Sequence, residues 1–189
     1  MVPEFPRPGV KWTLGFLYMQ ESADPNNTEV VARAYFDAVA RRDVPAMAAC
    51  WEPGSKDVLH GVAELSVPAG LESWFGALFA AFPDFSFEVL DVLASGEKAA
   101  VRWRATGTFN GNAKFEGLSP NGKSVAVEGT DVLTVRGGKV VHNDAYTNSV
   151  ELLRQLGALP PEGSGQEKAM TALLNAKTKA SAWLASRRG

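Results

Sequence analysis

The stretch Gly137–Gly157, GGKVVHNDAYTNSVELLRQLG, contains a turn, a strand and the start of a helix. A Gly-Gly pair forms the turn, and alternate positions of the following strand carry four polar side chains: His142, Asp144, Tyr146 and Asn148. Side chains two residues apart in a strand point to the same face. We therefore expect these four groups to share one surface, with Val141 and Ala145 on the opposite side.

Two interpretations of this polar row stay open from the residues alone. A strand face that meets water carries polar side chains by default. Alternatively, the row lines a pocket, where a neighbouring His and Asp tune each other's proton affinity and move protons near neutral pH. The second histidine of the chain, His60, comes just before a glycine after an apolar pair and favours the pocket.

Length and composition exclude several classes of protein. A chain of 189 residues that is 46% hydrophobic is long enough to bury one good core. Its net charge of −2 provides no basic field for nucleic acid. The single cysteine, Cys50, allows no internal disulfide and no thiolate cluster for zinc, and we expect it to be a small buried residue.

The chain divides into three parts. Residues 1–25 form an N-terminal arm, 26–161 a folded domain, and 162–189 a linker with a final amphipathic helix. The apolar run near the start is too short to span a bilayer and lacks a small-residue cleavage site. We therefore expect a cytoplasmic protein without a membrane partner.

Within the domain, helical periodicity comes first and alternating periodicity follows. The sequence predicts helices at 26–42, 44–52, 70–82 and 148–157, with a capping box at Asn26–Glu29. Strands are expected at 85–93, 99–109, 124–135 and 139–147, and 56–67 as an extended stretch with a loop. The short turns between these strands predict an antiparallel meander, since parallel neighbours need long crossovers.

This order resembles the nuclear transport factor 2-like, or cystatin-like, fold. That fold is an α+β cone in which a curved antiparallel sheet wraps around N-terminal helices and encloses a pocket. The segments Tyr35–Asp43, Gly138-Lys139 and Leu152–Gly157 are similar to the SnoaL-like polyketide cyclase branch. The resemblance covers about Thr28 to Pro161.

The SnoaL-like pattern places Glu, Trp and the general base Asp where this chain has His142, Asp144 and Asn148. An amide cannot take a proton as a carboxylate does. The resemblance therefore implies that Asp144 or His142 replaces the missing base. Asn148 also suits the cap of the following helix.

Ketosteroid isomerase, which shares the scaffold, stabilises an oxyanion with a Tyr of its first helix and a protonated Asp. It is a known example of an enzyme in which an apolar site raises the pKa of a carboxyl group. The resemblance puts Tyr35 and Asp131 at those two places and His60 near the region of the base. In an apolar cavity, Asp131 would have its proton affinity raised.

The first functional hypothesis is thus a SnoaL-like enzyme that needs neither metal nor organic cofactor. It would cyclise or isomerise a small apolar carbonyl compound, and we expect a homodimer. The pocket is expected to be lined by aromatic side chains: Trp74, Phe75, Phe79, Trp103, Phe109 and Tyr146. The alternatives are an epoxide or lactone hydrolase that uses Asp131, Arg102 and Asp144, and a non-catalytic module for ligand binding or protein interaction.

Overall fold

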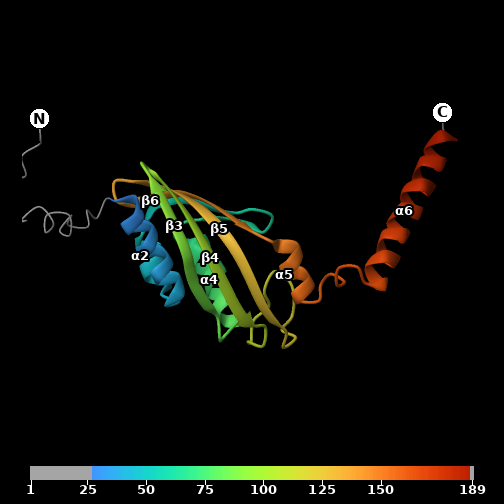
Figure 1. Cartoon of the computed structure of the whole chain (residues 1–189), viewed down its shortest axis with the longest axis horizontal. Helices are drawn as coiled ribbons and strands as arrows, with labels where there is room; N and C mark the ends of the chain where they lie inside the picture. Colours follow the sequence, from blue (N-terminus) through green and yellow to red (C-terminus); the bar gives the residue numbers. More distant parts are fainter. Residues whose placement is uncertain (1–26, 188–189) are drawn as a thin grey trace, which may run out of the picture.

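The computed structural model describes residues 27–187 and shows one curved sheet with helices along it (Figure 1). The first half of the domain contains α2 (Thr28–Ala40), α3 (Val44–Ala49), β1 (Trp51–Leu59), β2 (Ala63–Ser66) and α4 (Ala69–Ala81). The second half contains β3 (Ser86–Ser95), β4 (Lys98–Thr108), β5 (Ser124–Arg136), β6 (Lys139–Thr147) and α5 (Ser149–Gln155). A last helix, α6 (Gly165–Ser186), follows a short linker. The expected arm, 1–25, lies outside the described residues.

The six strands form one sheet in the order β2-β1-β6-β5-β4-β3. The predicted meander from β3 to β6 is confirmed, because each of these neighbours pairs antiparallel. Beside it, β1 pairs antiparallel with β2 but parallel with β6. The sequence showed no sign of this parallel pair, since its two strands are joined through α4 and the whole meander.

The helices begin where side chains satisfy the free N–H groups of the first turn. Asn27 caps α2, and its side chain accepts hydrogen bonds from the N–H groups of Glu29 and Val30. The cap is one residue later than the sequence predicted. Asp43 caps α3 by accepting from the N–H of Ala46. The apolar stripe of α2 then packs against β3, β4, β5 and β6, so Tyr35 and Phe36 are buried.

The second helix is shorter than predicted. It ends at Ala49, and Trp51 already begins β1, which continues across Pro53 and Gly54. Gly54 has a φ of +87°, a value that residues with a Cβ rarely adopt, so this strand bends without a loop. The bend brings Asp57 beside β6.

The final helix projects away from the sheet (Figure 1). An ion pair of 2.6 Å between Arg154 in α5 and Glu167 in α6 joins it to the domain. Met170, Leu173, Leu174 and Trp183 are exposed apolar side chains along its length. None of the helices in the described part of the chain combines the length and the apolar character needed to cross a bilayer.

Candidate active site

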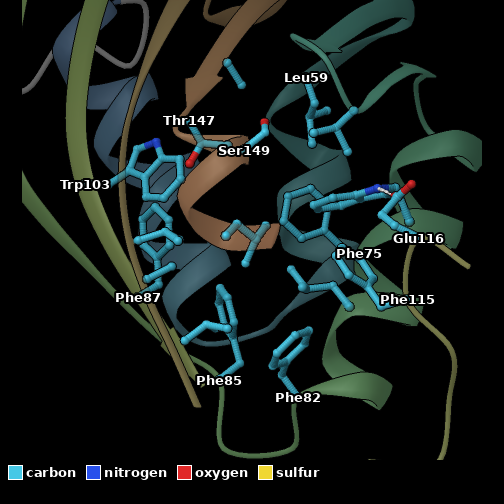
Figure 2. A pocket seen from close by; sticks show the side chains of 18 of the residues that line it. Leu59, Phe75, Phe82, Phe85, Phe87, Trp103, Phe115, Glu116, Thr147 and Ser149 are labelled. Carbon is cyan, nitrogen blue, oxygen red and sulfur yellow. Dashed lines mark hydrogen bonds between the residues drawn. The ribbon is translucent and has the colours of Figure 1, made fainter. Parts of the chain in front are cut away.

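A cavity of about 270 Å³ lies between the sheet and the helices, and its walls are mainly apolar, with aromatic and aliphatic side chains (Figure 2). Phe75, Phe82, Phe85, Phe87, Trp103 and Phe115 point into this space in Figure 2. Glu116 stands at the rim and accepts a hydrogen bond of 2.9 Å from the indole N–H of Trp74. Such a volume suits a small, mostly apolar ligand.

The buried end of the cavity carries two carboxyl groups that share one amide. The Nδ2 of Asn143 donates to Asp57 Oδ1 at 2.9 Å and to Asp131 Oδ2 at 2.7 Å. The indole N–H of Trp103 donates to the other oxygen of Asp131, Oδ1, at 2.7 Å. Asp57 and Asp131 are 2% and 6% exposed, and both line the cavity. The result is a hydrogen-bonded acidic pair in an apolar pocket.

Strand register brings these groups together. Asp57 of β1 is paired directly with Asn143 of β6, and Asp131 of β5 is paired with Ala145, two residues further along β6. On β4, Trp103 lies opposite Gly129, where a Cβ would come within 2.2 Å of the indole ring. The missing side chain at Gly129 leaves the space in which the indole lies with its N–H at Asp131.

Burial sets the proton affinity of the pair. Desolvation, followed by the neighbouring charge of Asp131, raises the pKa of Asp57 to about 7. Desolvation also raises the pKa of Asp131 to about 6, although the N–H groups of Trp103 and Asn143 oppose it. Asp131 therefore ionises first, and its charge helps Asp57 to keep a proton near neutral pH.

Tyr35 extends the polar network into α2. Its ring is 1% exposed and lines the cavity together with Asp57 and Asp131. Burial, with the charges of Asp57 and Asp131, raises the Tyr35 pKa well above 10. The hydroxyl therefore stays protonated and is available as a donor. Trp51 packs edge-on against this ring.

The predicted polar row does not face the cavity. His142 and Asp144 have side chains that are 39% and 31% exposed, lie 3.2 Å apart, and do not line the pocket. The inward positions of β6 carry Val140, Asn143, Ala145 and Thr147 instead. The cause is a bulge: the β5–β6 register shifts between Val135↔Val140 and Thr134↔His142, which moves Val141 out of the alternation.

His60 and Tyr146 lie at the mouth of the cavity, where they are half-exposed and exposed. Their rings stack with centroids 4.3 Å apart, and the His60 Nε2 lies 2.8 Å from Asp144 Oδ1. That contact lowers the pKa of Asp144. Asp144 is thus the centre of a surface cluster with both histidines and is separated from the buried pair by the sheet.

The other predicted site residues fall in several places. Trp74, Phe75 and Trp103 line the cavity, whereas Phe79 and Phe109 do not and belong to the packed core. Asn148 caps α5 by accepting from the N–H of Glu151 at 3.1 Å, and it does not line the cavity.

Arg102 is an outer-face residue. Its side chain is 58% exposed and lies 3.8 Å from Glu128. The triad of Asp131, Arg102 and Asp144 suggested by the hydrolase hypothesis is therefore not assembled in this structure.

Two residues of the buried network, Asp57 and Asn143, were absent from the sequence prediction. Asn143 lies between the apolar Val141 and Ala145, and a polar residue inside an apolar row was the available signal. Asp57 is three residues before His60, and the sequence prediction assigned a site role in this segment to His60 alone. Among residues 27–187, no group of three His, Cys, Asp or Glu side chains is arranged to hold a metal ion.

Comparison with known proteins gives a family match and several similar folds. Residues 32–143 match the model of the SnoaL-like domain. A search of curated proteins finds no match. The crystal structure of AclR from Streptomyces galilaeus, a candidate hydroxylase, is 26% identical with a TM-score of 0.63, and the match covers 86% of this chain and 96% of AclR.

Two further structures are similar in fold alone. A candidate SnoaL-like polyketide cyclase from Jannaschia sp. CCS1 is 23% identical with a TM-score of 0.61, covering 74% of this chain and 99% of that one. An NTF2-like protein from Burkholderia thailandensis E264 is 18% identical with a TM-score of 0.60, covering 69% and 97%. The expected α+β cone is confirmed.

Proposed function

The chain belongs to the SnoaL-like domain family, and we propose that it is an enzyme that moves protons on a small, apolar carbonyl compound. The observation that carries this proposal is the pair Asp57 and Asp131, held by one amide at the buried end of an aromatic cavity. The proposed base is thus not the His142–Asp144 pair expected from the sequence.

Asp57 is the proposed general base. A catalytic base works best with a pKa near the working pH, and the pKa of Asp57 is raised to about 7. Its carboxylate takes a proton from the carbon next to the carbonyl. The electron pair of that C–H bond forms the enolate double bond, and negative charge moves to the carbonyl oxygen.

Tyr35 is the proposed donor to that oxygen. Its hydroxyl stays protonated, and Tyr35 lines the same cavity as the proposed base. A donor already fixed in a dry site stabilises a developing oxyanion better than water does. Asp131 acts as a positioning residue, because its charge, held by Trp103 and Asn143, raises the pKa of Asp57.

Two outcomes complete the reaction. In an isomerisation the substrate carries a C=C bond between its β and γ carbons, so the enolate is a dienolate; Asp57 returns the proton to the γ carbon, and the C=C bond moves to the α and β carbons. In a cyclisation, the enolate carbon attacks a second carbonyl carbon, a C–C bond forms, and the resulting alkoxide takes the proton from Asp57. Both outcomes return Asp57 to its starting state. The cyclase assignment of the Jannaschia protein supports the second one.

The common first step can be tested without knowing the substrate. A neutral bicyclic ketone, 2-tetralone, is incubated with the protein in D₂O, and deuterium uptake next to the carbonyl is followed by NMR. We expect the protein to accelerate uptake, and Asp57→Asn to lower the rate by about 10²- to 10⁴-fold, the usual contribution of a general base.

The matched control is Asp144→Asn, the same change on the outer face, which should leave the rate unchanged. Tyr35→Phe should slow exchange by removing the donor while the base remains. Equal rates for the wild type and Asp57→Asn, or no acceleration by the wild type, would contradict the proposal.

A further inference from the structure

The cavity is lined by acidic side chains and by no basic one of the lysine or arginine type. Its lining includes the carboxyl groups of Asp57, Asp131 and Glu116, but it includes no lysine or arginine. Among the described residues, neither Asp57 nor Asp131 forms an ion pair with a cationic side chain within 4 Å. Buried charges in proteins are normally paired. When Asp57 and Asp131 ionise, no lysine or arginine of the cavity lining pairs with them.

The partners of the pair are neutral. The amide of Asn143 and the indole of Trp103 donate hydrogen bonds to it, which stabilises a carboxylate without cancelling its charge. Asn143 is fully buried, and its Oδ1 has no hydrogen-bond partner. Asn143 does not line the cavity, so the acceptors that a ligand can meet there are those of Asp57 and Asp131, which favour a ligand that brings positive charge or N–H groups.

The walls add a second attraction for a cation. The aromatic side chains that line the same cavity as the acidic pair include Trp74, Phe75, Phe85, Phe87 and Trp103. Aromatic faces attract ammonium groups, most strongly where water is excluded, and cages of such rings recognise quaternary ammonium ligands. Acidic groups and aromatic walls therefore select the same kind of ligand for independent reasons.

We infer that the cavity binds small hydrophobic cations, namely tertiary amines and quaternary ammonium compounds, with the positive nitrogen at Asp57 and Asp131 and the apolar part against the aromatic walls. The inference concerns the cavity of the proposed enzyme but does not depend on catalysis. A neutral ligand of equal shape leaves the charge uncompensated, and an anionic one is repelled.

Three probes of similar size test the inference: benzyltrimethylammonium, its neutral carbon isostere neopentylbenzene, and the anion phenylacetate. Trp74 and Trp103 line the cavity, so binding can be followed by tryptophan fluorescence of the full chain. At pH 8 we expect the cation to bind at least about tenfold more tightly than the isostere, and the anion to bind most weakly.

Benzyltrimethylammonium keeps its charge at every pH, so its pH profile reports on the protein alone. The other titratable groups that line the cavity are Tyr35 from α2 and, at the mouth, His60, Tyr146 and Glu116. Affinity for the cation should rise between pH 5 and pH 8, because the acidic pair ionises in this window. Affinity for neopentylbenzene should not rise.

The double variant Asp57→Asn and Asp131→Asn should lose the preference for the cation and still bind the neutral isostere. Asp91→Asn removes an exposed carboxyl group of β3 and is the matched control. Equal affinity of the wild type for cation and isostere at pH 8, or a preference that survives in the double variant, would overturn the inference. If the double variant does not fold, the single variants and the pH series decide. If the protein accelerates deuterium exchange of the ketone but does not bind the cation, the inference is wrong and the proposed function still stands.

Discussion

At the scale of single residues, Asn143 decides the geometry of the site. One side-chain amide holds two carboxyl groups, and both of its N–H donors are used. A hydrogen bond to a charged group contributes about 1.5–3 kcal/mol. The loss of Asn143 would therefore leave two buried acids without their shared donor.

We expect Asn143→Leu, which keeps a similar volume, to lower the free energy of unfolding by about 3–5 kcal/mol at pH 8. The loss should be smaller at pH 4, where both carboxyl groups are protonated. Urea denaturation at the two pH values measures the difference. Equal losses at both would mean that Asn143 contributes only packing.

The raised pKa of Asp57 has a consequence for stability. The unfolded chain releases this proton near pH 3.8, whereas the folded protein keeps it up to about pH 7. Because the folded state binds more protons in between, stability should fall as the pH rises from 4 to 7. One pH unit corresponds to about 1.4 kcal/mol, so ionising Asp57 costs the folded state roughly 4 kcal/mol.

Asp57→Asn should make this decline smaller, although Asp131, whose pKa is raised to about 6, still contributes to it; thermal melts of both proteins from pH 4 to pH 8 measure the difference. The matched control is Asp144→Asn, because the pKa of Asp144 is lowered and its contribution is lost only below pH 4. An unchanged decline in Asp57→Asn would show that Asp57 is not the group responsible.

Sequence and resemblance identified Tyr35 and Asp131, because helix one and the turn before β6 carry local patterns that fix their positions. They missed Asp57 and Asn143 for a physical reason. Asp57 approaches Asn143 only through the parallel pairing of strands 86 residues apart at these positions, which no local pattern reports.

At the scale of elements, β6 shows how one irregularity changes a prediction. The boundaries 139–147 were predicted correctly, but the bulge after Val140 exchanged the faces of the following residues. Sequence alternation cannot reveal such a bulge, because a polar row fits a solvated face and a cavity equally well.

This exchange of faces can be tested directly. Ala145 lines the cavity opposite Asp131, while His142 lies on the outer face. We expect Ala145→Phe to fill the cavity and weaken binding of any probe by at least about tenfold. His142→Phe adds a similar ring outside and should leave binding unchanged. Fluorescence titration with neopentylbenzene compares the two, and the reverse result would restore the predicted orientation of the row.

At the scale of the whole molecule, α6 is separate from the domain. Its described side chains are exposed, apart from Glu167, which pairs with Arg154. A partly exposed ion pair is worth about 1 kcal/mol or less. Ending the chain after Pro161 should therefore change the stability of the domain by no more than that, as measured by urea denaturation. A much larger loss would show that α6 packs on the domain in solution.

The same truncation bears on the expected homodimer. The exposed apolar residues of α6, such as Leu173 and Trp183, are the part of the chain that gains most from contact with a second copy. We expect the truncated chain to sediment as an assembly of fewer subunits than the full chain. Identical assembly states for both would place the subunit contact elsewhere.

The parallel pairing of β1 with β6 also has a consequence for folding during synthesis, because the two strands are far apart in the chain. β1 is made before its neighbour β6, so the edge of β1 that pairs with β6 has no partner until nearly all of the domain has been synthesised. During that delay the edge is open to the wrong partners, such as another nascent chain. The amide that joins the two acids belongs to the last strand, so the acidic pair can be assembled only after β6 has been made and lies between β1 and β5.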